Sequence, residues 1–155
     1  MLIEVAVITY LLTVNPIKNF VYQSKDQSGV ITPQIRYGSL PDDGYPALLV
    51  DSSTPDFTHT FSKGLKTGHR LAYSLFQFRC MASSELAARE LATLTMDAFA
   101  DYPPNTLMGG SQGVMIRGSL AMSISPTMQE TTGTNEIVYS AVLTVKLSHD
   151  RSVYP

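Results

Sequence analysis

The chain has 155 residues, of which 44% are hydrophobic and only 15% are charged, and its formal net charge is −2. A chain of this length is most simply one domain with a real core, because folding at this size buries roughly two-thirds of the extended-chain surface. The weak acidic balance gives no electrostatic basis for binding the DNA backbone. A charged share below the roughly 25% of an average globular protein suggests that assembly covers some surface, although a large uncharged polar surface would explain it too.

Residues 2–13 carry a broad apolar face at helical spacing and predict an N-terminal helix, while their β-branched residues leave a strand open as an alternative. Asn15 and Pro16 end this segment, and residues 16–23 predict one further helical turn. Glu4 interrupts the apolar run and no basic segment precedes it, so a signal peptide is not expected. The apolar runs are also too short to predict a membrane span.

The next part of the chain predicts a loop and two short strands. Residues 24–34 are polar and typical of a loop, and strands are predicted at 35–40 and 47–51 with a Pro-Asp-Asp-Gly turn between them. Residues 53–69 alternate aromatic and polar side chains between polar ends. This segment predicts either an exposed hairpin or a projecting arm.

Residues 71–101 predict a strand that runs directly into a helix, and the rest of the chain is organised around this unit. Apolar side chains occur on both parities of 71–82, so we expect this strand to be covered on both faces. Ser83 and Ser84 are good N-cap residues, and an alanine-rich apolar stripe then predicts a long helix over about 84–101. Prolines at 103 and 104 end it.

The last third of the chain predicts a glycine-rich flexible connection at 105–113 and then a long antiparallel hairpin. Its strands are joined by a polar loop at 127–135, and the tail at 149–155 is predicted to be short and mobile. The predicted buried face is formed by Val114, Ile116, Leu120, Met122 and Ile124, facing Ile137, Tyr139, Ala141, Leu143, Val145 and Leu147.

Together these elements predict one α+β domain over residues 1–155. Its sheet is mainly antiparallel, the long helix at about 84–101 packs on one face, and an N-terminal helix completes the fold. No internal repeat or linker divides the chain.

Residue types that carry catalysis or bind metals do not cluster in the sequence. The histidines His59, His69 and His149 have no spacing typical of metal ligands, and solvated loop positions explain them better. Cys80 lies mid-strand and predicts a buried thiol, with a cysteine–histidine nucleophile pair as the alternative. The glycines at 109–113 lead into a strand and lack a following Lys-Ser/Thr, so they favour a flexible loop over a phosphate loop. We therefore expect no enzyme, cofactor or metal site.

A small group of cations provides the candidate interface residues. Lys63, Lys66 and Arg70 form a basic cluster in the predicted arm, and Arg117 and Lys146 lie on the polar face of the C-terminal strands. A solvated surface is one explanation for such charges. The functional interpretation is contact with an acidic partner or an adjacent subunit.

The order of these segments resembles that of the tail-terminator (tail-completion) and minor capsid proteins of long-tailed bacteriophages. After the apolar N-terminal helix, the resemblance rests on SLPDD at 39–43 with YPALLV at 45–50, on FQFRCMA at 76–82 with SELAAREL at 84–91, and on VYSAVL at 138–143. It covers most of the chain, and the arm and the glycine-rich connection match least.

The resemblance implies a structural subunit of the virion, assembled in the host cytoplasm. Such a subunit forms a ring with its own copies, with a hexamer expected, caps the tail tube protein and joins the neck or head connector protein. No membrane contact and no specific nucleic-acid contact are implied, although DNA passes through such a ring. One alternative is a head-completion or neck connector (stopper) protein of the same virion, and another is a small cytoplasmic ligand-binding α+β domain.

Overall fold

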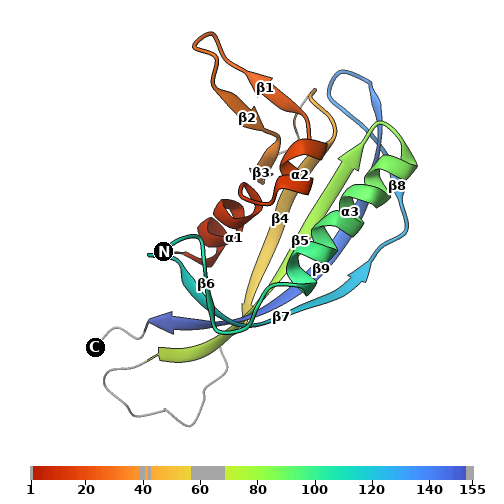
Figure 1. Ribbon diagram of the computed structural model, residues 1–155. Helices are drawn as coiled ribbons and strands as arrows, with labels where there is room; N and C mark the ends of the chain where they lie inside the picture. The colour runs from red at the N-terminus through yellow and green to blue at the C-terminus, as the bar shows by residue number, and fades with distance from the viewer. Residues whose placement is uncertain (1, 39–40, 42, 57–68, 153–155) are drawn as a thin grey trace.

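The computed structural model describes residues 2–38, 41, 43–56 and 69–152, and residues 52–56, 69–70 and 151–152 are described by their backbone alone. The fold is α+β, as predicted, with one large sheet and the helices gathered on one of its faces (Figure 1). The large sheet has seven strands in the order β3-β4-β5-β9-β7-β6, and β8 pairs with β9 beside β7. Only β3 and β4 are parallel, so the sheet is mainly antiparallel. Its strands are β3 (Ile35–Tyr37), β4 (Ala47–Asp56), β5 (His69–Ala82), β6 (Thr106–Met108), β7 (Val114–Ile124), β8 (Met128–Thr131) and β9 (Ile137–Ser152).

The N-terminal segment forms two short helices, α1 (Ile3–Leu11) and α2 (Asn15–Phe20), which confirms the predicted helix and its further turn. Pro16 lies in the first turn of α2, where its missing N–H costs no hydrogen bond. The Tyr10 hydroxyl donates to the backbone oxygen of Ala98 at 2.6 Å, and its ring packs edge-on against Phe99. Through this contact α1 is held to the long helix as well as to the sheet.

Helix α3 (Glu85–Ala100) follows β5 with only two residues between them, as the sequence predicts. The Ser84 hydroxyl caps the helix by accepting from the Ala87 amide at 3.2 Å, which satisfies one orphan donor of the first turn. The buried stripe of α3 packs on β5 and β9, and it consists of Ala88, Leu91, Ala92, Thr95 and Phe99. The small alanines let the helix axis approach the sheet closely.

Strand β5 is covered on one face for most of its length, so the prediction of two covered faces is wrong. Ala72, Ser74, Phe76, Phe78 and Cys80 point to the helices and are buried. On the other parity Leu75 is 37% exposed, and Gln77 is exposed as well. The helices cover only one side of the sheet (Figure 1), which leaves the apolar residues of the other parity partly in water.

The polar segment 24–34 is part of a β-hairpin, where the sequence predicted a loop. Strands β1 (Gln23–Lys25) and β2 (Ile31–Pro33) pair antiparallel and form a separate two-stranded sheet. The Asp26 carboxylate accepts from the amides of Ser28 and Val30, both at 2.9 Å, and Gly29 supplies a positive φ of 85°. These local hydrogen bonds build the turn with side chains that are usually taken as loop signals.

The C-terminal strands pair antiparallel as predicted, but the segments around them contain two further strands. The predicted polar loop at 127–135 contains β8, and the connection at 105–113 contains β6. Two β-bulges in β7, at Arg117 and at Met122, each shift the register against β9 by one residue. A one-residue shift turns the following side chains to the other face. Leu120 and Met122 are therefore exposed, and the prediction that they belong to the buried face is wrong.

The two segments that the sequence predicts to be a projecting arm and a mobile tail are partly β-strand. Residues 53–56 continue β4 and pair with residues 73–76 of β5, and residues 69–70 begin β5. The rest of the predicted arm, 57–68, lies outside the described residues. Strand β9 runs on to residue 152 and buries His149, so the prediction of a mobile tail is wrong for residues 149–152.

In the tight turn between β6 and β7, we expect the substitution of one glycine to destabilise the fold strongly. A Cβ at Gly113 would lie 1.9 Å from the backbone oxygen of Met108, whereas the nearest atom to a Cβ at Gly118 is 3.9 Å away. We expect Gly113→Ala to lower the free energy of unfolding by about 1–3 kcal/mol, because backbone has to move. Gly118→Ala, the matched control, should change it by less than about 1 kcal/mol. Equilibrium urea unfolding measures both, and equal effects would contradict this packing.

Candidate functional site

The face of the sheet away from the helices carries a row of partly apolar side chains that we call the open-face patch, formed by Tyr73, Leu75, Leu120 and Lys146. Leu75 pairs with Lys146, and Lys146 pairs with Leu120, so the three side chains form one row across β5, β9 and β7. The Lys146 Nζ lies 4.5 Å from the centroid of the Tyr73 ring, in a cation–π contact. Its aliphatic stem therefore lies between the two leucines.

The two leucines of the open-face patch are in contact with water, since Leu75 is 37% exposed and Leu120 is more exposed still. Leu120 is 59% exposed, and its orientation follows from the bulge at Arg117, because without it Leu120 would point to the helices. Tyr73 and Lys146 are half-buried. Lys146, which the sequence predicted as an interface residue, belongs to this patch.

The same face is closed at its other end by a small apolar cluster and an ion pair. Leu49, Met81 and Val138 are buried together there. Beside them, the Arg79 guanidinium lies 2.8 Å from an Asp51 carboxylate oxygen and 3.8 Å from one of Glu130. Arg79 is thus paired within the chain, whereas Glu130 Oε2 is buried without a hydrogen-bond partner.

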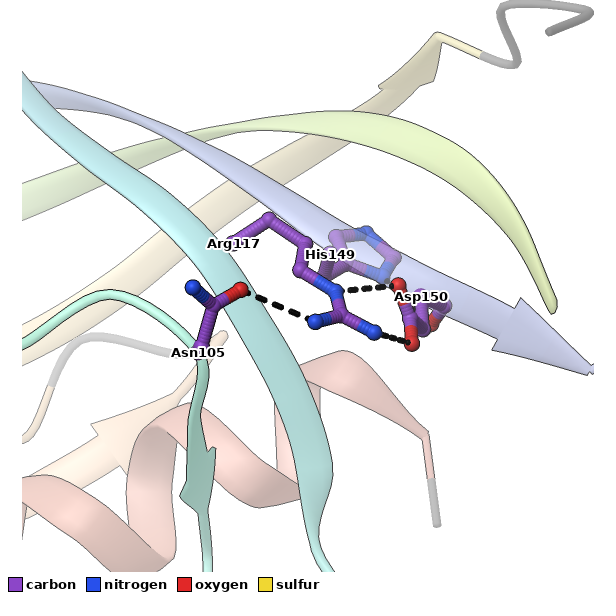
Figure 2. Close-up of polar contacts among 4 residues, drawn as sticks. All are labelled: Asn105, Arg117, His149 and Asp150. Carbon is purple, nitrogen blue, oxygen red and sulfur yellow. Dashed lines mark hydrogen bonds and ion pairs between the residues drawn. The ribbon is translucent and has the colours of Figure 1, made fainter.

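Arg117 is held in a polar cluster at the edge of the sheet. Its Nε and Nη2 donate to the two carboxylate oxygens of Asp150 at 2.8 and 2.6 Å, and Nη1 donates to the Asn105 side chain at 2.8 Å (Figure 2). The hydrogen bonds to Asp150 raise the pKa of Arg117 above its ordinary value. The bidentate pair ties β7 to β9 just where the first bulge interrupts their ladder.

Of the five predicted interface cations, the structure describes the side chains of two, Arg117 and Lys146. Lys63 and Lys66 lie outside the described residues, and Arg70 lies in β5 with only its backbone described. Arg117 uses its guanidinium within the chain, while Lys146 stands in the open-face patch. Their role as interface residues stays a prediction.

Two residues with catalytic potential, Ser74 and His149, lie side by side in the core. The Ser74 Oγ is 2.8 Å from His149 Nε2, and His149 Nδ1 is 3.1 Å from the backbone oxygen of Asp150. A carbonyl oxygen only accepts, so Nδ1 donates to it, and Nε2 of the neutral ring accepts from the serine hydroxyl. This is the hydrogen bond of a serine–histidine nucleophile pair.

Burial gives this pair a structural role. His149 is 5% exposed and Ser74 is also buried, so a substrate has no direct approach to the hydroxyl. The prediction of a solvated His149 is therefore wrong, while the side chains of His59 and His69 lie outside the described part. Burial lowers the pKa of His149, while the Asp150 backbone oxygen and the nearby Asp150 and Glu4 carboxylates act to raise it.

Cys80 is buried beneath α3, as predicted, and burial raises the pKa of its thiol to about 12. A thiol with such a pKa is not a nucleophile near neutral pH. Within the described ranges, no group of three or more His, Cys, Asp or Glu side chains could hold a metal ion. The described helices also include none that is long and apolar enough to cross a membrane.

Comparison with known proteins adds no assignment: no protein-family model matches the chain, and no curated protein matches it.

The buried histidine predicts a pH dependence of stability. Above its ordinary pKa of 6.5 the ring is neutral in both the folded and the unfolded chain, and stability is full. As the pH falls below that value, the unfolded chain takes up the proton first, because the folded-state pKa is lowered. We therefore expect the free energy of unfolding to fall as the pH is lowered through 6.5, and to go on falling until the pH reaches the lowered folded-state pKa.

His149→Gln tests this assignment, because glutamine keeps a donor and an acceptor and does not titrate. Urea unfolding at several pH values should show a smaller loss of stability on acidification in the variant than in the natural protein. An unchanged pH profile would show that groups other than His149 produce the dependence.

Proposed function

We propose that this chain is a structural virion protein that acts by binding, without turnover. In this proposal it is a ring-forming tail terminator that caps the tail tube of a long-tailed bacteriophage and joins the tube to the neck. It assembles in the host cytoplasm, where a reduced, buried Cys80 is expected. The resemblance of the sequence to such proteins motivates the proposal, and one observation on the sheet supports it.

That observation is the exposure of the open-face patch. An antiparallel sheet can leave one face in water, but the residues on such a face are then usually polar. Here two leucines and a lysine stem form a row on the face that the described helices leave uncovered. Assembly against a second protein would remove this row from water, and we assign the tail tube protein to it.

A ring also suits the strand order. At the end of the sheet that contains residues 137–140, the order is β3-β4-β5-β9-β8, so β3 and β8 lie at opposite edges. Subunits of a ring meet through two different surfaces, and closure leaves no free edge for further pairing. A hexamer is the ring size we propose.

Leu120→Asp is the variant that tests the patch. Burying one leucine contributes about 1.5–3 kcal/mol, so losing it and burying a charge should weaken binding to preassembled tail tubes by at least about tenfold. Co-sedimentation with tubes of the same phage, together with negative-stain images of capped tubes, measures the effect. The melting temperature should change little, because the side chain is already exposed.

Val5→Asp is the matched control. Val5 is an exposed apolar residue on α1, in the helix layer, so it lies away from the open face. This variant should cap tubes as the natural protein does. Full capping by Leu120→Asp, or equal loss in both variants, would remove the patch from the proposal.

The same experiment separates the neck alternative. A connector or stopper protein of the same virion would bind the head side of the joint and leave tail tubes uncapped. If the protein binds purified heads but does not bind tubes, the connector or stopper role replaces the tail-terminator role. A strictly monomeric protein that binds neither would overturn the structural assignment.

A further inference from the structure

The hairpin of β1 and β2 projects from the body of the protein at one edge of the sheet (Figure 1), and we call residues 22–33 the hairpin arm. The arm is anchored at its base by backbone hydrogen bonds from Tyr22 to Pro46 and from Gln34 to Tyr22. An isolated two-stranded hairpin is marginally stable in water. The turn at Asp26 and Gly29 offsets this by holding the tip in shape.

The two faces of the hairpin arm differ in chemistry. Lys25 and Ile31 are directly opposite each other across the strands, so their side chains share one face. Ser24 and Thr32 form the next pair and lie on the other face. Ile31 is 57% exposed at this edge of the molecule. One face of the arm therefore carries Lys25 with Ile31, and the other carries Ser24 and Thr32 together with the exposed Tyr22 and Val30.

The basic character extends to the base of the arm, where Arg36 is exposed on β3. The arm also holds an acid, Asp26, but its carboxylate accepts hydrogen bonds from the turn itself. Asp43 near the base is exposed and reduces the positive charge there. On the face that carries Ile31, the arm presents Lys25.

The end of the sheet where β5 ends and α3 begins has the complementary composition. Ala82, the last residue of β5, pairs with Tyr139, so α3 begins at the same end of the sheet as the start of β9. Two apolar residues are exposed there, Leu86 at 81% and Ile137 at 50%. Beside them lie the exposed acids Glu85 and Glu136. We call Glu85, Leu86, Glu136 and Ile137 the acidic edge.

The acidic edge is also locally ordered. The Thr127 hydroxyl lies 3.0 Å from a Glu85 carboxylate oxygen and ties the start of α3 to the segment that enters β8. Glu90 adds a further exposed acid one turn along α3, and Arg89 is the cation beside it. Two of these acids, Glu85 and Glu136, are the direct sequence neighbours of the exposed leucine and isoleucine.

We propose that the occupant of the acidic edge is the hairpin arm of a second copy of this chain. Ile31 packs against Leu86 and Ile137, and Lys25 lies opposite Glu85 and Glu136. The arm is formed by β1 and β2 beside β3, whereas the acidic edge lies on α3 and at the start of β9. The contact therefore joins two different surfaces head-to-tail and leaves each subunit with one arm and one edge for its next neighbours. The inference rests on the self-assembly in the proposed function, but not on the tail tube as the partner.

Both electrostatic attraction and the burial of apolar side chains would stabilise this contact. Lysine facing two carboxylates steers the subunits toward each other and disfavours arm-to-arm or edge-to-edge pairing, because like charges would then meet. The isoleucine and leucine that are now in water supply the apolar burial. A head-to-tail arrangement satisfies both conditions, whereas a contact between two copies of the same surface would bury apolar side chains but place like charges together.

Two variants that each damage one surface test the contact. Ile31→Asp places a negative charge against the acidic edge, and Leu86→Lys places a positive charge against the arm. Each should be monomeric in size-exclusion chromatography with light scattering at concentrations where the natural protein forms rings. Both positions are exposed, so far-UV circular dichroism and the melting temperature should remain those of the natural protein.

Mixing the two monomeric variants gives the decisive result. The intact arm of Leu86→Lys can bind the intact edge of Ile31→Asp, and at the other contact the introduced carboxylate and ammonium groups have opposite charges and attract each other. We therefore expect the two variants to associate in a 1:1 ratio, as heterodimers or as mixed rings, detected by an affinity tag on one variant. Thr32→Asp, on the other face of the same hairpin, is the matched control and should assemble normally.

Each outcome decides the inference separately from the proposed function. A mixture that stays monomeric, or variants that assemble as the natural protein does, would overturn this contact even if the rings still cap tail tubes. Rings that depend on both surfaces but do not bind tubes would support the contact and overturn the tail-terminator role. A natural protein that is monomeric at every concentration would overturn both.

Discussion

Three phenyl rings hold the helix layer on the sheet, and the asymmetry of the whole molecule follows from them. Phe78 on β5 stacks on Phe99 of α3 with ring centroids 4.9 Å apart, and Phe76 stacks on Phe78 at 6.0 Å. All three side chains are fully buried. Because the rings on β5 all point to one face, α3 can cover only that face. The side chains at the alternate positions of β5, such as Leu75 and Gln77, therefore lie on the face that α3 does not cover.

The helix layer buries the potentially reactive side chains of this protein and lowers their reactivity. Ser74, Cys80 and His149 all lie on the side of the sheet that the helices cover, where their polar atoms are removed from water. Burial keeps the thiol protonated and favours a neutral imidazole. The hydrogen bond between serine and histidine then satisfies two buried polar groups across β5 and β9, which is what an otherwise apolar core requires of them.

The elements that the sequence predicts well are those whose signals are local. Ser84, the alanine stripe and the following prolines determine α3 by capping, spacing and termination within one segment. The exposure of Leu120 could not be predicted in this way. Its direction depends on a bulge at Arg117, and the bulge shows itself only in the pairing of β7 with β9. Strict alternation along 114–124 predicts one continuous face, and a single extra residue reverses it.

The hairpin arm and β8 were missed for a different reason. Asp26, Ser28 and Gly29 are typical of loops. Here they form a tight turn, in which the Asp26 carboxylate accepts from the amides two and four residues further on, and the strands on either side are each only a few residues long. Short polar strands carry almost no periodic signal, so their existence depends on a partner strand. The candidate interface cations illustrate the same limit. A sequence shows which residues are charged, but it does not show which residues lie beside them in the fold, such as Asp150 beside Arg117.

The surfaces assigned to assembly can be used at the same time, because they lie on different parts of the molecule. The hairpin arm continues into β3, the acidic edge lies on α3 and at the start of β9, and the open-face patch lies across the central strands. Contacts through the arm and the acidic edge would therefore leave the open-face patch of every subunit uncovered. The one-sided helix layer underlies this division: its phenyl stack closes one face of the sheet, and the described helices leave the other face uncovered.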